Sequence, residues 1–218
     1  GDVVDGPTTP DQNRLSNAAT ELPSSQVEES AIPSYTHENL LLRTLFQVRG
    51  NAVLKWISDQ ASSVLDVGCG AGVLAEALDT TSKRTVTGID IAPEAAKAYF
   101  QPSSRVRIVK GDITKLPFED DSFDCIVAMD VLEHFDELER PLFELSRVVS
   151  SEGQLLVTGP TENWMYRVGR YIAGFSGDYH PKSVYEVGEA VERRFGEPTR
   201  KRTISIGGPL FEVLDYRG

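Results

Sequence analysis

Hydrophobic residues recur at three- and four-residue steps from about Glu38, which is the spacing of one face of a helix. The apolar positions of this stripe are Leu41, Leu45, Val48, Ala52 and Trp56. The pattern predicts an amphipathic helix, and Gly50 is a candidate break that would divide it into two.

Beyond this stripe, short apolar runs alternate with helical patterns. The runs typical of buried strands are 64–67, 86–89, 106–109, 125–128 and 154–158, and the helical patterns cover 73–78, 93–100 and 138–148. Strands separated by helices indicate an α/β fold in which a parallel sheet carries helices on both faces. The last two runs, 201–206 and 211–216, are joined by a connection too short for a parallel crossover, so this pair is expected to be antiparallel.

The first 33 residues have a different character, rich in Pro, Ser, Thr, Asn, Gln and acids without a sustained period. Such a segment cannot bury enough apolar surface to offset the entropy lost on ordering. We expect residues 1–33 to form a disordered tail, with a lid over substrate as the alternative, and residues 34–218 to form one domain.

Composition narrows the classes of function. The 218 residues are 40% hydrophobic and 25% charged, which is typical of a globular domain. The formal net charge of -11 repels phosphate backbones, so no nucleic-acid partner is expected. The two cysteines, Cys69 and Cys125, form no metal or disulfide pattern, which favours a reducing, cytoplasmic location. No apolar run is long enough to predict a transmembrane helix.

The most informative motif runs from Val64 to Gly72, where a strand leads through a glycine-rich turn into a helix. Its glycines are spaced Gly68-x-Gly70-x-Gly72, whereas the dinucleotide fingerprint places its last glycine one residue later. Asp66 precedes the first glycine by two residues, and a carboxylate there would repel a pyrophosphate. The turn therefore favours a ligand that carries an ammonium group, with a plain strand-to-helix turn as the alternative.

Further acids follow the next strands. Asp90 ends the second strand, where a carboxylate can accept hydrogen bonds from both hydroxyls of a ribose. Asp112 follows the third strand and is a candidate acceptor for an adenine amine. Helix capping or turn formation is the simpler role for each acid alone. The fourth strand runs into a loop at 129–134. The glycine turn, Asp90, Asp112 and this loop all fall on the carboxyl edge of the sheet, where open α/β sheets bind ligands.

The run from Val64 to Pro160 resembles the class I S-adenosylmethionine (SAM)-dependent methyltransferases, notably the ubiquinone/menaquinone-biosynthesis-type subgroup. The stretches that carry the resemblance are 64–72, 88–90, 111–113, 116–118, 123–124, 132–134 and 153–157, in the order of the family. The resemblance implies a Rossmann-like, doubly wound sheet of seven strands with the last strand antiparallel. It also implies SAM as the cofactor and S-adenosylhomocysteine as the product.

The resemblance further implies a role for each matching residue. Asp66 and the turn of Gly68, Cys69, Gly70 and Gly72 would hold the methionine part of SAM. Asp90 would hold the ribose, Ile91 would pack on the adenine, and Asp112 and Ile113 would face it. Met129 and Asp130 would line the donor pocket near the sulfonium. No metal is implied.

If the acceptor is a hydroxyl, a side chain must take its proton, and the candidates are His180, His134, Glu133 and, less favoured, His37. His180 lies in a loop in which Asp178 or Tyr179 is available to orient its imidazole. His134 lies beside the fourth strand, where a packing role is the favoured alternative. A surface position is the alternative for His180.

The segment 163–179 places five apolar residues on one helical face: Trp164, Val168, Tyr171, Ile172 and Phe175. The simpler interpretation is a helix that packs on the sheet. The alternative is a helix that caps an apolar acceptor and makes weak contact with a membrane surface through Arg167 and Arg170. The chain is interpreted as a monomeric or homodimeric enzyme that methylates a small-molecule or lipid-like acceptor. The alternatives are a SAM-binding regulatory protein without catalysis and a nicotinamide-dependent oxidoreductase.

Overall fold

The computed structural model describes residues 40–79, 84–100, 105–163, 166–167, 181–205 and 207–217. The predicted tail at 1–33 lies outside these residues. Among the described helices, none has the length and apolar character needed to cross a membrane.

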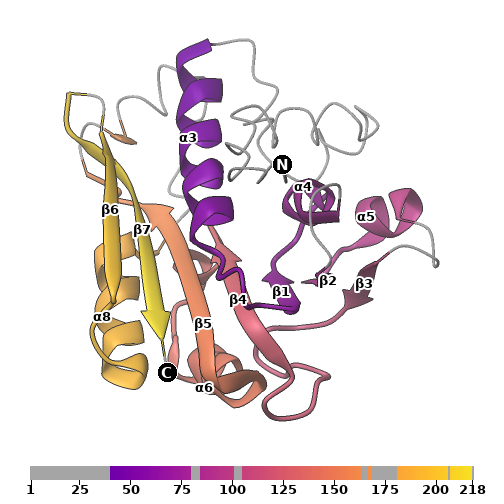
Figure 1. The fold of residues 1–218 in the computed structure, drawn as a ribbon. Coiled ribbons are helices and arrows are strands. Elements are labelled where there is room, and N and C mark those ends of the chain that lie inside the picture. Colours follow the sequence, from indigo (N-terminus) through magenta and orange to yellow (C-terminus); the bar gives the residue numbers. More distant parts are fainter. Residues whose placement is uncertain are drawn as a thin grey trace, which may run out of the picture.

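A seven-stranded sheet organises the chain in the order β3-β2-β1-β4-β5-β7-β6 (Figure 1). Its strands are β1 (Ser63–Val67), β2 (Thr85–Asp90), β3 (Val106–Lys110), β4 (Phe123–Met129), β5 (Val149–Pro160), β6 (Arg200–Ser205) and β7 (Pro209–Arg217). The first five strands pair in parallel, whereas β7 runs antiparallel to both β5 and β6. The predicted fold class and the antiparallel C-terminal pair are confirmed.

Helices cover both faces of this sheet, because successive side chains of a strand point to opposite faces. Val64 of β1 packs with α3 (Leu40–Trp56) and α4 (Val73–Asp79) in one hydrophobic cluster. The next residue, Leu65, belongs to a second cluster that contains residues of α6 (Glu139–Val148) and α8 (Val184–Phe195). A short helix, α5 (Glu94–Tyr99), follows β2. The parallel strands therefore deliver their carboxyl ends to one edge of a sheet that is buried on both sides.

Two features of the helices differ from the sequence prediction. Helix α3 continues through Gly50, so the expected break is wrong. One glycine costs a helix about 1 kcal/mol, and the burial of Leu45, Ala52 and Val53 on the same helix outweighs that cost. Helix α8 was not predicted, although Ser183 and Glu186 form a reciprocal capping box at its start.

Candidate functional site

The glycine turn after β1 is held in a conformation that favours glycine. The φ angles of Gly68, Gly70 and Gly72 are 69°, 51° and 88°, in the left-handed region that side chains with a Cβ avoid. A Cβ added to Gly68 would lie 2.8 Å from a methyl group of Val131, in the loop after β4. A Cβ added to Gly72 would lie 2.6 Å from the ring of Phe100. The turn is thus a closely packed cradle in which Gly68 is exposed, Gly70 half-buried and Gly72 buried.

Asp66 lies under this cradle, one residue before the end of β1. Its side chain is buried, and its Oδ2 has no hydrogen-bond partner among the described residues. Burial, and then the charge of Asp90, raise the pKa of Asp66 to about 8. A buried carboxylate without a partner is costly, so this atom is suited to a cationic ligand group placed in the turn.

Asp90 closes the other side of the cradle at the tip of β2. Its Oδ2 accepts a hydrogen bond from the backbone N–H of Gly70 at 2.9 Å, and its Oδ1 accepts one from Ala92 at 2.9 Å. The carboxylate therefore fixes the turn to β2 and keeps further lone pairs for a ligand. The next side chain, Ile91, is 71% exposed, and an apolar side chain left so open at a ligand edge is suited to a flat aromatic group.

The thiol of Cys69 is packed inward, against Gly88 of β2. Burial raises the pKa of this thiol, and the charges of Asp66 and Asp90 raise it further. The uncharged thiol is a poor nucleophile, which is consistent with a packing role for Cys69 in the turn.

The residues expected to face an adenine lie after β3. Asp112 is exposed, and its Oδ1 accepts a hydrogen bond from the N–H of Thr114 at 2.8 Å, as in an Asx turn. Ile113 is only 6% exposed and packs in the cluster on the α6 side of the sheet, with Leu116. Asp112 thus already performs the simpler role of a turn acid, and the proposed contacts of both residues with a ligand stay predictions.

At the end of β4, Met129 is half-buried and Asp130 adopts a positive φ of 55°. The Asp130 carboxylate pairs with Arg49 of α3 at 2.5 Å and accepts a hydrogen bond from the Thr158 hydroxyl at 3.2 Å. The guanidinium of Arg49 lies 4.6 Å from the ring centroids of both Phe46 and Phe211. Asp130 is therefore anchored to α3.

The 3-10 helix η1 (Leu132–His134) follows β4 and contains two of the acid–base candidates, Glu133 and His134, which differ in burial. Glu133 is 1% exposed, and its Oε1 has no hydrogen-bond partner among the described residues. Burial, and then the charge of Asp130, raise the pKa of Glu133 well above its usual value, and Arg49 opposes the shift. His134 is exposed. Of this pair, Glu133 is the one enclosed beside Asp130.

Other predicted residues lie outside the described part of the chain, namely His37, His180 and most of 163–179. In the part that is described, Asn163 and Tyr166 cover β7: Asn163 Nδ2 donates to the Pro209 carbonyl at 2.5 Å, and the Tyr166 ring meets Phe211 edge-on at 5.4 Å. These contacts agree with packing on the sheet for the start of the segment.

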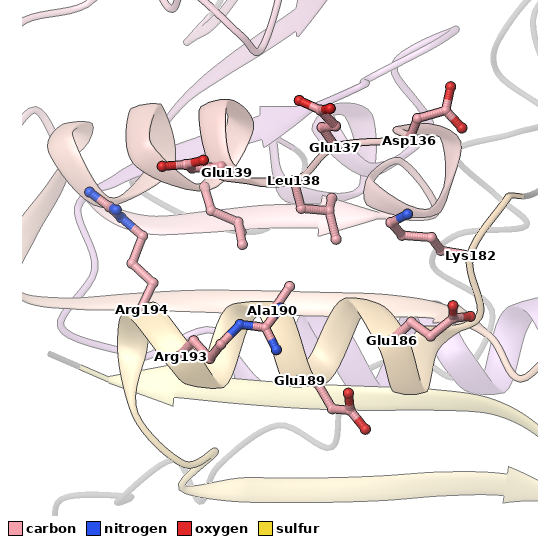
Figure 2. Close-up of a pocket in the computed structure, with 11 residues that line it drawn as sticks. Asp136, Glu137, Leu138, Glu139, Lys182, Glu186, Glu189, Ala190, Arg193 and Arg194 are labelled. Atoms are coloured by element: carbon pink, nitrogen blue, oxygen red, sulfur yellow. The ribbon is translucent and has the colours of Figure 1, made fainter.

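A groove of about 700 Å³ opens between α6 and α8 (Figure 2). Leu138 and Ala190 line it from opposite helices, among charged side chains such as Glu189 and Arg193. No residue of the glycine turn lines it, and Asp66 and Asp90 are also absent from its walls. The groove is a feature of the helix layer and is separate from the cradle.

Sequence reasoning missed Arg49 and did not foresee the burial of Glu133. Arg49 belongs to a helix whose register with the sheet no local pattern reveals, so its pairing with Asp130 was not foreseen. Glu133 was considered only as one of several bases, and its burial depends on which way η1 turns. The sequence signal for Glu133 was its place in the 132–134 stretch that carries the family resemblance.

Comparison with known proteins agrees with this arrangement. A family model described as "Methyltransferase domain" matches residues 65–157. Over 100 residues the chain is 36% identical to the sterol 4-C-methyltransferase strm-1 of Caenorhabditis elegans, covering 43% of this chain and 29% of that protein. Over 119 residues it is 33% identical to the ubiquinone biosynthesis O-methyltransferase of Pseudomonas putida (strain GB-1), covering 50% of this chain and 51% of that protein. The chain thus spans about half, or less, of these relatives.

Solved structures share the fold at lower identity. The PH0226 protein from Pyrococcus horikoshii OT3 superposes with a TM-score of 0.70 at 20% identity, over 86% of this chain and 96% of that one. The N-methyltransferase NodS from Bradyrhizobium japonicum WM9, solved with S-adenosyl-L-homocysteine, gives a TM-score of 0.66 at 18% identity, over 94% and 98% of the two chains. Residues 65–157 thus match a methyltransferase domain, and the seven-stranded sheet has the fold of solved methyltransferase structures.

Proposed function

We propose that the chain transfers a methyl group from SAM to a small-molecule or lipid-like acceptor. The observation that carries this proposal is the buried Oδ2 of Asp66, which has no partner among the described residues and lies under a glycine cradle. The methionine part of SAM carries an ammonium group that would satisfy this oxygen. An NAD pyrophosphate would instead bring negative charge toward it, which disfavours the oxidoreductase alternative.

The residues around the cradle fit the remaining parts of SAM. The carboxylate of Asp90 would accept hydrogen bonds from the ribose hydroxyls, and the exposed Ile91 would pack on the adenine, which Asp112 and Ile113 would also face. Met129 and Asp130 would line the pocket near the sulfonium. When bound, SAM supplies a methyl group activated by the positive charge of its sulfur.

The chain's own contribution is mainly alignment and the exclusion of water, because the donor needs no further activation. The Arg49–Asp130 pair holds the β4 loop, and Val131 of that loop packs directly on Gly68. The β4 loop and the glycine turn are thereby held in fixed positions relative to each other. A proton released by the acceptor needs a base, for which His134 and His180 remain the sequence-based candidates.

The kind of acceptor is proposed from the relatives, and the location from the cysteines. The relatives named above are a sterol methyltransferase and a ubiquinone biosynthesis enzyme, which supports a small and lipid-like acceptor. Monomeric or homodimeric assembly and the absence of a nucleic-acid partner stay predictions. A cytoplasmic location is supported by the two cysteines, Cys69 and Cys125, which are free and buried.

The proposal is tested by calorimetric titration of the protein with S-adenosylhomocysteine and, separately, with NAD. We expect micromolar binding of S-adenosylhomocysteine, which Asp90→Ala weakens at least tenfold, or about 1.4 kcal/mol. Asp124→Ala is the control, because that acid bonds Ser62 at the opposite edge of the sheet. Binding of NAD in place of S-adenosylhomocysteine would refute the proposal. Transfer of labelled methyl to small-molecule extracts then separates an enzyme from a silent SAM-binding protein.

A further inference from the structure

Glu133 belongs to η1, in the loop that follows β4 and contacts the glycine cradle. The loop that carries it follows β4, which pairs with β1 in register up to Val67↔Ala128. Val131 of this loop contacts the glycine cradle. On the other side, β5 pairs with β4 and ends at Pro160. Strand β4 lies between β1 and β5 in the sheet (Figure 1), so the loop that carries Glu133 follows the strand between the donor cradle and β5.

One oxygen of the Glu133 carboxyl is left over by the fold. The carboxyl accepts a hydrogen bond from its own backbone, yet its buried Oε1 has no hydrogen-bond partner among the described residues. Glu144 provides the contrast, since it is similarly buried at 4% exposure, yet its Oε2 accepts from the Leu116 N–H at 2.9 Å and pairs with Arg147 at 2.8 Å. A fold that only needed to bury Glu133 would lose nothing by replacing it with an apolar residue. The unsatisfied oxygen thus points to a ligand.

The charges near Glu133 favour a positively charged group on that ligand. Asp130 at the end of β4 and Glu162 after β5 both disfavour its ionised form, and Arg49 from α3 is the opposing cation, already paired with Asp130. From α8, the residues that share the cluster of Leu132 are apolar, including Val184 and Val187. Of the charges that act on Glu133, the two carboxyls of Asp130 and Glu162 raise its pKa and the guanidinium of Arg49 lowers it. An added cation would be stabilised there, whereas an anionic acceptor would be repelled.

We propose that Glu133 forms the acceptor subsite and that this subsite takes an acceptor with a basic nitrogen, carried as an ammonium ion. The inference rests on the proposed methyl transfer and names the class of its substrate. On binding, the protonated Glu133 carboxyl releases its proton to solvent and pairs with the ammonium. For transfer, the carboxylate takes one N–H proton, and the freed nitrogen lone pair forms the new N–CH₃ bond. The electrons of the broken S–CH₃ bond remain on sulfur, which becomes neutral.

The test uses protein saturated with S-adenosylhomocysteine and matched pairs of probes: benzylamine and benzyl alcohol, 2-phenylethylamine and 2-phenylethanol, hexylamine and hexan-1-ol. Calorimetry in buffers of different ionisation enthalpy counts the protons released. We expect at least one amine to bind at least tenfold more tightly than its alcohol and to release up to one proton. Glu133→Gln should remove both the preference and the proton release, which a purely structural role would not require.

Two further variants serve as controls for the Glu133→Gln result. Glu133→Asp retains a carboxyl and should retain proton release with weakened affinity. Glu144→Gln loses a buried carboxyl that is fully engaged within the fold, and it should leave the amine preference within twofold of the wild type. The proposal is overturned if no amine binds better than its alcohol, or if Glu133→Gln keeps the preference. Failure of S-adenosylhomocysteine itself to bind would instead refute the proposed function.

Discussion

Replacing Asp66 by Asn tests whether this buried acid pairs with the ammonium group of the donor. In the protein without ligand, burial and Asp90 raise the pKa of Asp66 to about 8. Pairing with an ammonium requires the ionised form, which is the minor form at neutral pH. Ionising the carboxyl therefore costs about 1.4 kcal/mol for each pH unit below 8.

The affinity for S-adenosylhomocysteine should consequently rise about tenfold per unit between pH 6 and pH 7.5, as binding releases the Asp66 proton. Calorimetric titration at several pH values measures this slope. In Asp66→Asn we expect the slope to vanish and the affinity at pH 7.5 to fall at least tenfold, because the amide keeps the shape and removes the charge.

The free energy of unfolding has the opposite pH dependence to the binding affinity and serves as the control. The pKa of Asp66 in the folded protein, about 8, lies above its ordinary value of 3.8, so the folded protein binds more protons than the unfolded chain between these values. Its contribution to stability is present below pH 4 and is lost as the pH rises toward 8. Asp66→Asn should lack this loss and be at least as stable as the wild type at pH 7. A variant that keeps the pH slope of binding would refute the reasoning.

Three further substitutions test the packing that supports the site, each measured by urea unfolding. Gly72→Ala should lose about 1–3 kcal/mol of stability, since the left-handed φ and the Phe100 ring both oppose a Cβ; a neutral effect would show that the turn readily rearranges. Arg49→Met should cost about 2–4 kcal/mol, because Asp130 loses its ion-pair partner, and Asp130→Asn in the same background should restore part of it. Ser183→Ala should cost about 1 kcal/mol through the lost cap of α8, with Ser205→Ala, an exposed position on β6, expected to change little.

The alternation of strands and helices was readable from the sequence because it depends on local periodicity. Each of the first five strands contains a short stretch with apolar residues, such as Val64, Val86 and Ile126, and the short link at 207–209 was enough to predict an antiparallel pair. Helix α8 was missed although its buried residues, such as Val184, Val187 and Val191, recur at the three- and four-residue steps of one helix face. This spacing and the capping box at its start were the signals that could have revealed it.

The site was predictable where a motif is continuous in the chain and not where distant segments meet. The glycine cradle with Asp66 and Asp90 lies on two consecutive strands, so their edge placement followed from topology. The pairing of Arg49 with Asp130 depends on how α3 crosses the sheet, which no local pattern encodes. Likewise, sequence cannot tell which of the neighbours Glu133 and His134 turns inward, and the 3-10 turn decides it.

The antiparallel strand β7 determines which fragments of the protein can be expressed without exposing a strand edge. Residues 211–217 of β7 pair with residues 154–160 of β5, from Gln154↔Arg217 to Pro160↔Phe211. Helix α3 packs onto β7 through the contact of Phe46 with Phe211. A fragment limited to the recognisable segment 65–157 would present β5 as a bare edge, ready to pair with another chain. The stretch that identifies the family is thus shorter than the unit that folds, and an expressed fragment of that stretch is expected to aggregate.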